Sequence, residues 1–482
     1  MMYKMYINGA FVDSVSGKTR TIINPATKAV IATVPEAQIE DVNAAVAAAR
    51  AAFDGDEWKC KTAQDRQKIL FAIAGKIRDN FEAFVKLEVE NNGKPIREAE
   101  FDIDDAASCF EFYAGLATKI HGETMNVPGN SFSYVTREAI GVCAQIIPWN
   151  FPFLMCAWKL GPAIAAGNTV VLKPSEVTPL TALFLAQLIA ELDIPKGVIN
   201  IVTGDGPVAG NALISNTKID KIAFTGGTST GKYIGKIAAE NLKKVTLELG
   251  GKNPVVIFDD CKMDLAIDWG LFAAFANSGQ VCTAGSRILI QDTIYDAFVK
   301  QFVERAKNIQ VGDGSLIENT MGPIVSQAHF DKIKTYIEVG KAEATLAFGG
   351  NSDDSKGFFI EPTIFINVTP TMRIAREEIF GPVVALLKFS TEEEAIAMAN
   401  DTEYGLGYGL FTQDVTRVHR VMPKIRAGIG WVNFYHPTFN EMPWGGYKQS
   451  GTGRELGLYG IENYLEVKQV NINLDTDPVG WY

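Results

Sequence analysis

Short apolar runs that end in polar or glycine-rich turns recur along the chain from residue 141 onward. Helical stretches separate these runs, and the repetition of strand, turn and helix predicts parallel βαβ units and a doubly wound sheet. The first series occupies 141–152, 168–176, 197–206 and 221–231, and the second occupies 253–260, 287–291 and 382–389. The pattern therefore predicts an α/β fold with two successive parallel-sheet units and a boundary near Gly250 and Gly251.

Two kinds of segment lie outside these series. Residues 38–54 are rich in alanine with helical periodicity, and 63–92 continue in the same style with interleaved charges. Residues 120–139 and 464–474 instead contain alternating apolar and polar side chains, as strands do. The alternation leaves open whether these two β segments pair with each other, join another subunit's edge, or lie at the edges of the main sheets.

Composition narrows the possible partners. The 482 residues are 47% hydrophobic and carry a formal charge of −11, which argues against nucleic acids and anionic membranes. No apolar stretch reaches the length of about 18 residues that a membrane span requires, and the start lacks the apolar run of a signal peptide. The six cysteines contain no CxxC pair and the four histidines are far apart, so we expect a cytoplasmic protein with free thiols and no metal site.

One cysteine has neighbours that are unusual for a free thiol. Cys282 in FANSGQVCTAGSR (275–287) is surrounded by small or polar side chains, whereas free cysteines usually lie among apolar neighbours. Gly279 and Gly285 on either side permit a ligand to approach the backbone closely. A nucleophile fits this pattern, and a structural thiol is the alternative that holds for any single cysteine.

A glycine-rich turn follows one predicted strand of the first series. In KIAFTGGTSTGKYIG (221–235), Gly226, Gly227 and Gly231 precede or open an amphipathic helix that we expect to begin near Thr230. The free N–H groups at such a helix start can bind phosphate. The glycine spacing matches neither GxGxxG nor a P-loop, so an ordinary strand-to-helix turn is the alternative.

The segment NTVVLKPSE (168–176) delivers Lys173, Ser175 and Glu176 together at the carboxyl end of a short apolar strand. Doubly wound sheets bind their ligands at this edge. A carboxylate there can accept hydrogen bonds from both ribose hydroxyls of an adenosine and would repel a 2′-phosphate. The alternative is a solvated loop that Pro174 terminates.

Two polar residues are placed where they could act in catalysis. Asn150 lies in a loop that Pro148 and Pro152 stiffen, so its amide could donate to a developing oxyanion or simply satisfy a turn. In KKVTLELGGKNP (243–254), alternation directs Glu248 away from the apolar face just before a Gly-Gly turn. Glu248 is therefore either a general base or an exposed acid.

Eight motifs in this order resemble those of the NAD(P)-dependent aldehyde dehydrogenase superfamily. They are PWNFP (148–152), KPSE (173–176), FTGG (224–227), LELGGKNP (247–254), GQVCTAGSR (279–287), EEIFGPV (377–383), PWGGYKQSGTGRELG (443–457) and YLEVK (464–468). The resemblance implies an aldehyde dehydrogenase-like fold with three parts. These are a Rossmann-like NAD-binding domain from 1–119 and 140–250, a catalytic domain from 251–450, and an oligomerisation β element from 120–139 and 466–482 that builds a dimer or tetramer.

The resemblance also implies the catalytic roles. Cys282 is the nucleophile, Glu248 the general base, and the Asn150 amide with the backbone N–H of Cys282 the oxyanion hole, while Glu455 is a proton-relay or supporting carboxylate. The thiolate, activated by backbone dipoles and Glu248, attacks an aldehyde; a hydride leaves to NAD⁺, and Glu248 activates the water that hydrolyses the thioester. The presence of Glu248 favours hydrolysis over transfer to coenzyme A.

The implied cofactor is NAD, with NADP disfavoured by Glu176. Lys173 and Glu176 hold the adenosine ribose, Trp149 and the glycine turn lie along the diphosphate, and Glu378 and Phe380 position the nicotinamide half. The full predicted cofactor site is Ile146, Pro148, Trp149, Lys173, Ser175, Glu176, Gly226, Gly227, Gly231, Glu248, Glu378 and Phe380.

The substrate prediction rests on a narrower resemblance to betaine aldehyde and aminoaldehyde dehydrogenases. Phe151, Trp158 and Trp444 match the aromatic residues of their substrate tunnel, which surround an ammonium group by cation–π contacts. Ala276 stands where plant aminoaldehyde relatives have a further aromatic residue. We therefore predict betaine aldehyde or an ω-aminoaldehyde as substrate. The alternatives are a broad-specificity aldehyde dehydrogenase and a non-catalytic binding protein, although the latter would be expected to have lost Cys282, Glu248 or Asn150.

Overall fold

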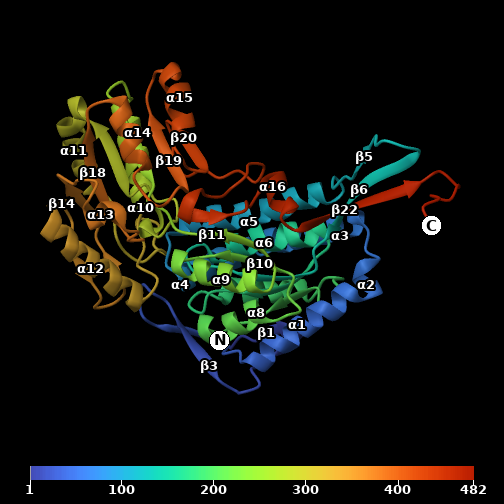
Figure 1. The fold of residues 1–482 in the computed structure, drawn as a ribbon. Coiled ribbons are helices and arrows are strands. Elements are labelled where there is room, and N and C mark those ends of the chain that lie inside the picture. The colour runs from blue at the N-terminus through green and yellow to red at the C-terminus, as the bar shows by residue number, and fades with distance from the viewer. Residues whose placement is uncertain (1) are drawn as a thin grey trace.

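The first sheet forms one half of the molecule in the computed structural model, which describes residues 2–482 (Figure 1). Its eight strands follow the order β2-β1-β9-β8-β7-β10-β11-β21. The parallel centre consists of β7 (Val142–Ile146), β8 (Thr169–Lys173), β9 (Ile199–Ile201), β10 (Lys221–Thr225) and β11 (Lys244–Glu248), and the antiparallel strands are β1 (Met5–Ile7), β2 (Ala10–Val12) and β21 (Gly451–Thr452). The chain fills the sheet outward from β7 to β9 and then returns to β10, so the strand order reverses between β7 and β10.

Helices pack on this sheet, and the hydrophobic core lies between them and the strands. The helices of this half are α1 (Ile39–Asp54), α2 (Asp56–Lys59), α3 (Ala63–Asp79), α4 (Phe81–Asn92), α5 (Ile96–Ala117), α6 (Pro152–Ala166), α7 (Leu180–Ile189), α8 (Asn211–Ser215), α9 (Thr228–Glu240) and α16 (Gly457–Glu462). The predicted helical segment 63–92 is divided in two, because Asn80 leaves the helical conformation and caps both α3 and α4. Helix α9 begins at Thr228, earlier than predicted, since Gly227 before it is already extended.

The second sheet confirms the prediction of two parallel-sheet units. Its order is β14-β17-β18-β13-β12-β19-β20, with antiparallel pairing only between β14 and β17 among the described strands. The strands are β12 (Pro254–Ile257), β13 (Arg287–Gln291), β14 (Thr345–Phe348), β17 (Thr363–Ile366), β18 (Val383–Phe389), β19 (Gly407–Phe411) and β20 (Ile429–Val432). The helices are α10 (Met263–Phe275), α11 (Asp292–Ala306), α12 (Gln327–Glu343), α13 (Arg373–Arg376), α14 (Glu392–Asn400) and α15 (Val415–Val421).

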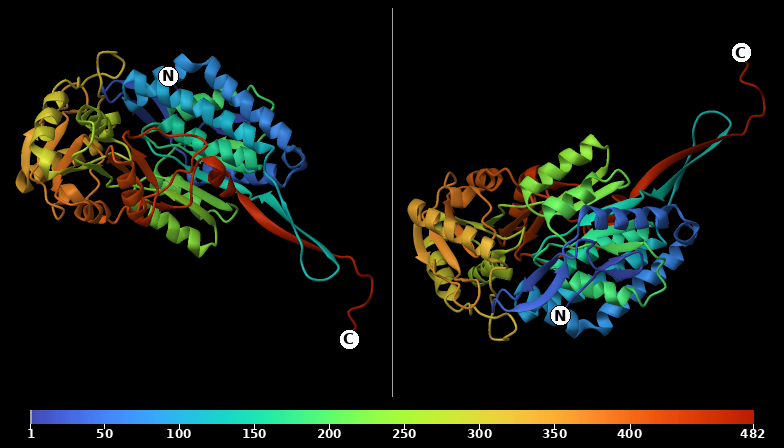
Figure 2. Two further views of the ribbon diagram at one scale, coloured as in Figure 1. Left: turned by 90° about the horizontal axis from the view of Figure 1, so that it is seen from above. Right: turned by 90° about the horizontal axis from the view of Figure 1, so that it is seen from below.

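The remaining strands form short separate sheets. A β arm combines β5 (Glu123–Met125), β6 (Ser131–Ala139) and β22 (Leu465–Asn473) and projects away from both main sheets (Figure 2). Strands β6 and β22 pair along their whole length, from Leu465 opposite Ala139 to Asn473 opposite Ser131. The two alternating segments thus pair with each other, and their placement at the edges of the main sheets is wrong. Two hairpins complete the fold: β3 (Thr19–Ile23) with β4 (Val30–Pro35), and β15 (Ser352–Asp353) with β16 (Phe359–Ile360).

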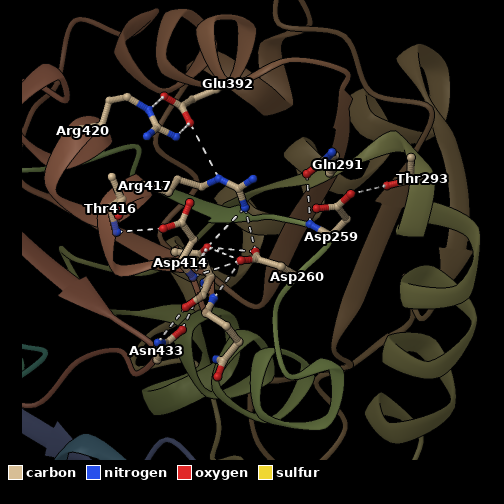
Figure 3. Close-up of polar contacts among 12 residues, drawn as sticks. Asp259, Asp260, Gln291, Thr293, Glu392, Asp414, Thr416, Arg417, Arg420 and Asn433 are labelled. Carbon is tan, nitrogen blue, oxygen red and sulfur yellow. Dashed lines mark hydrogen bonds and ion pairs between the residues drawn. The ribbon is translucent and has the colours of Figure 1, made fainter.

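A polar network ties together the carboxyl edge of the second sheet (Figure 3). Asp260, just after β12, accepts hydrogen bonds from the Thr412 hydroxyl and the Arg417 guanidinium, both at 2.8 Å, and from the backbone N–H of Asp414 at 3.1 Å. The Arg417 guanidinium lies 4.4 Å from the centre of the Phe258 ring. This edge, where doubly wound sheets commonly bind ligands, is therefore filled by the protein's own charged side chains.

Candidate active site

A cavity of about 550 Å³ lies where the two sheets meet. The carboxyl ends of β7, β10 and β11 contribute Trp149, Gly226 and Glu248, whereas the segments before β13 and β18 contribute Cys282 and Glu378. The first sheet thus faces the cavity with its carboxyl edge and the second with its amino edge. Both the volume and the mixture of apolar walls with a few polar groups are typical of small-molecule sites.

Most of the predicted cofactor residues lie at the carboxyl edge of the first sheet, and Glu378 and Phe380 come from the segment before β18 of the second. Ile146 and Lys173 end β7 and β8 and are register partners, and Glu248 ends β11. Pro148, Trp149, Gly226, Gly227, Glu378 and Phe380 line the cavity, and Ser175 and Glu176 follow directly after Lys173. Because the strand order reverses between β7 and β10, this edge has the crevice in which such sheets hold nucleotides.

The glycine turn after β10 fits a pyrophosphate. Gly226 and Gly227 line the cavity, and a Cβ atom on Gly227 would meet open space, so the start of α9 is accessible. The thirteen-residue helix α9 directs its first N–H groups toward this opening. Gly231 lies inside α9, away from the cavity wall, and its missing side chain lets the helix pack on Leu249, whose Cδ1 would lie 2.8 Å from an added Cβ.

The Lys173 side chain is only 3% exposed, while the Glu176 side chain remains accessible. The Lys173 ammonium donates to the Pro174 carbonyl at 3.2 Å and lies 3.9 Å from the Glu176 carboxylate. Burial lowers the pKa of Lys173, and the carboxylates of Glu176 and Asp205 oppose that shift. The pair offers one donor and one acceptor side by side, which suits the two hydroxyls of a ribose.

The loop that carries Cys282 is held by side-chain amides. It begins with a 3-10 turn (Ala276–Gly279) in which Asn277 and Ser278 have left-handed backbones, with φ of 46° and 56°. The Asn150 amide donates to the Gln280 carbonyl at 2.9 Å, and the Asn253 amide donates to the Cys282 carbonyl at 2.9 Å. Non-glycine residues adopt this conformation only where the surroundings enforce it, so the thiol is held in a predetermined position.

The thiol itself is protonated in this arrangement. Burial, followed by the nearby carboxylates of Glu378 and Glu248, raises the pKa of Cys282 to about 12. The backbone N–H of Thr283 acts in the opposite direction but more weakly. The activation of the thiol by backbone dipoles and Glu248 stays a prediction, because in this ligand-free arrangement desolvation and the Glu248 carboxylate both raise the thiol pKa.

Glu248 is buried in the same cavity. Its side chain is 4% exposed, and neither carboxyl oxygen has a hydrogen-bond partner among the described residues. Burial and the neighbouring Glu455 raise the pKa of Glu248 well above its ordinary value. Lys159 donates to Glu455 and, at 2.7 Å, to the Thr225 hydroxyl, so Glu455 is anchored while Glu248 is not. The two free oxygens can therefore bind a water molecule.

Aromatic side chains form the opposite wall. The three predicted tunnel residues, Phe151, Trp158 and Trp444, all line the cavity, and the Trp158 and Trp444 rings lie 5.3 Å apart in an edge-to-face arrangement. Ala276 also lines the cavity, at the position where the sequence lacks the further aromatic residue of the plant relatives. One helical turn earlier, Phe272 contributes a ring that is 44% exposed.

Two histidines of the cavity were not predicted. His329 donates to the Phe380 carbonyl at 2.6 Å and packs 4.9 Å from Trp149, beside the nucleotide edge. His436 donates from Nε2 to the Ala273 carbonyl and accepts at Nδ1 from the Thr283 hydroxyl, both at 3.2 Å. Burial lowers the pKa of each histidine to about 4, so both are neutral and His436 is not a strong base for the thiol. Their positions depend on chain segments far from Cys282, which no local motif signals.

Two negative findings apply to residues 2–482. No helix there is long and apolar enough to cross a membrane. That same part of the chain contains no group of three or more histidine, cysteine or acidic side chains that could hold a metal ion.

The chain belongs to the aldehyde dehydrogenase family, whose sequence profile matches residues 11–470. It is 46% identical to a betaine aldehyde dehydrogenase of Bacillus subtilis, with both chains covered completely, and 49% identical to an aldehyde dehydrogenase of Emericella nidulans over 98% of this chain and 95% of that one. A crystal structure of betaine aldehyde dehydrogenase from Staphylococcus aureus in complex with NAD⁺ superimposes with a TM-score of 0.98 at 45% identity, covering 100% of this chain and 96% of that one. The family and fold predicted from the motifs are confirmed.

The raised thiol pKa predicts how Cys282 reacts with iodoacetamide in the absence of other ligands. Because only the thiolate is alkylated, the rate at Cys282 should increase about tenfold per pH unit from pH 7 to 10. Mass spectrometry of the Cys282 peptide measures the rate, and the exposed Cys60 in the same digest reports reagent quality. A rate that levels off below pH 9 would contradict the raised pKa.

Proposed function

We propose that this chain oxidises an aldehyde carrying a cationic group to the carboxylic acid, with NAD⁺ as the hydride acceptor. The observation that carries the proposal is one cavity in which Cys282, Asn150 and Glu248 lie between a nucleotide-binding edge and an aromatic wall. On this basis 1–119 and 140–250 form the NAD-binding domain and 251–450 the catalytic domain. The NAD⁺ complex of the Staphylococcus aureus relative supports the cofactor assignment.

The chemistry begins at the Cys282 sulfur. After the thiol has released its proton to water, Sγ bonds to the aldehyde carbon, and the carbonyl oxygen becomes an oxyanion. The second N–H of the Asn150 amide and the backbone N–H of Cys282 stabilise that charge. As the C=O bond re-forms, a hydride leaves the carbon for the nicotinamide of bound NAD⁺, whose positive charge also favours the thiolate. A thioester on Cys282 remains.

Glu248 completes the reaction as the base for water. Its carboxylate takes a proton from a water molecule, and the resulting hydroxide attacks the thioester carbon. The C–S bond then breaks, which releases the carboxylic acid and returns Cys282 to the thiolate. The two unpartnered carboxyl oxygens support this role. The carboxyl group must first be ionised, and because its pKa is raised, hydrolysis should accelerate as the pH rises. A base for water favours hydrolysis over transfer to coenzyme A.

The Glu248→Gln variant separates the two half-reactions. The amide cannot accept the proton of water, so steady-state turnover should fall by about 10²- to 10⁴-fold. A single-turnover burst of NADH close to one per active site should persist, because hydride transfer does not use Glu248. Stopped-flow absorbance at 340 nm measures both phases, with Glu240→Gln on the exposed end of α9 as control. Equal loss of both phases would refute the assignment, and so would coenzyme A acting as a better acceptor than water in the unmodified enzyme.

One carboxyl group of the cavity favours a cationic substrate. Of the five acidic residues in the wall, Asp102 and Glu455 are paired with buried lysines, whereas Glu98 has no ion-pair partner among the described residues. Glu98 is half-buried beside the aromatic wall, accepts hydrogen bonds from the Asn277 N–H, and has a pKa that burial raises to about 7. A bound ammonium would be stabilised by Glu98 and by the faces of Trp158 and Trp444. An unsubstituted aldehyde, the alternative that the Emericella nidulans relative leaves open, gains nothing from the carboxylate.

An aldehyde panel tests this specificity. Betaine aldehyde and 4-aminobutanal should show higher kcat/KM than hexanal, and their KM should rise as the pH falls through about 7, because Glu98 loses its charge. Glu98→Gln should raise these two KM values by about tenfold, the equivalent of about 1.4 kcal/mol, with little change for hexanal. Glu100→Gln, an exposed neighbour on the same helix, is the control. A preference for hexanal would refute the cationic substrate.

The preference for NAD over NADP is proposed from Glu176. Its accessible carboxylate beside Lys173 can accept hydrogen bonds from a ribose and would repel a 2′-phosphate. The aldehyde panel is run with each cofactor, and the ratio of kcat/KM with NAD to kcat/KM with NADP measures the preference. Glu176→Ala should lower this ratio. We also propose a cytoplasmic location, because all six cysteines are free.

We further propose that residues 120–139 and 466–482, which contain most of the β arm, join subunits into a dimer or tetramer. The cross-strand pair Phe132 and Ile472 is exposed by 48% and 43% although both side chains are apolar. Burial of such a pair in a partner would remove its contact with water. The variant Phe132→Asp/Ile472→Asp should therefore dissociate in sedimentation velocity at micromolar concentration. Leu242→Asp, at a residue 93% exposed on the first domain, should not. A monomeric unmodified enzyme would refute the proposal.

A further inference from the structure

A buried ion cluster lies directly behind the oxyanion donor. Lys94, in the turn between α4 and α5, has a side chain with 0% exposure. Its ammonium pairs with the Asp102 carboxylate of α5 and lies 3.9 Å from the Glu88 carboxylate of α4. Withdrawing these charges from water is costly and is a poor source of stability by itself. A contribution to stability therefore does not explain why these charges are buried here.

The third contact of Lys94 leads to the active site. Its ammonium donates to the backbone carbonyl of Asn150 at 3.0 Å and lies 4.3 Å from the centre of the Phe151 ring. The Asn277 amide donates to the same carbonyl at 2.9 Å. The Asn150 carbonyl thus has two donors, one of them charged, and both come from groups that are buried themselves.

These contacts fix the direction of the Asn150 side chain. The amide nitrogen already donates one N–H to the Gln280 carbonyl at 2.9 Å. With the backbone held at its carbonyl and one N–H fixed, the planar amide has its second N–H in a single direction. That second N–H is the one assigned to the oxyanion, and a displacement of the order of 1 Å can lower a rate by about 10²-fold.

We propose that Lys94 is a positioning residue for the oxyanion donor Asn150, with Asp102 and Glu88 holding its ammonium in place. This rests on the proposed function, in which Asn150 stabilises the oxyanion on the substrate. Lys94 touches neither substrate nor cofactor in this assignment, and its influence on the rate passes through the Asn150 backbone. Its effect should therefore disappear once the Asn150 amide is removed.

A double-mutant cycle tests this dependence. Lys94→Met alone would leave Asp102 buried and unpaired, so the test variant is Lys94→Met/Asp102→Asn, in which both partners are neutral. The single-turnover rate of hydride transfer should fall by about ten- to a hundredfold, within the range for a lost oxyanion donor. In the Asn150→Ala background the same two changes should produce no further fall, since residues that act as a unit are non-additive.

Two readouts separate positioning from general damage. The NAD⁺ dissociation constant should change less than about twofold, and the alkylation rate of Cys282 by iodoacetamide should remain, because alkylation develops no oxyanion. Lys243→Met is the matched control: its ammonium also donates to two backbone carbonyls, those of Ile214 and Asn216, both at 2.7 Å and outside the cavity wall. This control should leave hydride transfer unchanged.

Each outcome decides between the proposals. Three results would overturn the role of Lys94: an unchanged rate in Lys94→Met/Asp102→Asn, additive losses in the Asn150→Ala background, or a parallel loss of alkylation and NAD⁺ affinity. Asn150→Ala at the full rate would instead overturn the oxyanion assignment itself. Asp102→Asn, which keeps Lys94, is the milder second variant if the first does not fold. It should lower hydride transfer several-fold, again only when Asn150 is present, and a fall that persists without Asn150 would overturn the inference.

Discussion

The hydrogen bond from the Asn150 amide to the Gln280 carbonyl connects the two halves of the active site. Asn150 belongs to the loop after β7 of the first sheet, whereas Gln280 lies two residues before Cys282 in the segment that leads into the second sheet. The Asn277 amide returns the contact by donating to the Asn150 carbonyl. The distance between the thiol and the oxyanion donor is set by this pair of contacts, so the relative position of the two sheets is part of the catalytic geometry.

Burial of the Cys282 thiol and the Glu248 carboxyl disfavours the charged form of both groups. Desolvation raises the pKa of both the Cys282 thiol and the Glu248 carboxyl in the ligand-free arrangement. Each group needs its charged form in order to act as a nucleophile or a base. In the proposed complex with NAD⁺, a cationic nicotinamide beside the sulfur would favour the thiolate and so couple thiol activation to cofactor binding.

Sequence patterns predicted those features that depend on local alternation and spacing. The alternation in 243–254 placed Glu248 at the end of a strand, and the run before Lys173 identified another strand end, because strand geometry is set within a few residues. The side-chain contacts around Cys282 could not be predicted in this way. His436 contacts Thr283 across 153 residues and Lys94 contacts Asn150 across 56 residues, so these contacts exist only after distant segments of the chain have packed together. Phe272 is intermediate, since helical spacing from Ala276 could have identified it.

The two sheets serve the site with opposite edges, and the polar network at Asp260 shows why this division is stable. The first sheet presents its carboxyl edge, where helix starts and strand ends suit an anionic nucleotide. The second sheet has the same kind of edge, but Asp260, Arg417 and Glu392 occupy it with mutual ion pairs. Its amino edge instead carries the loops before β13 and β18, which deliver Cys282 and Glu378 to the cavity. The nucleotide can therefore approach from one domain and meet the nucleophile of the other across a single cavity, which hydride transfer from a substrate bound to that nucleophile requires.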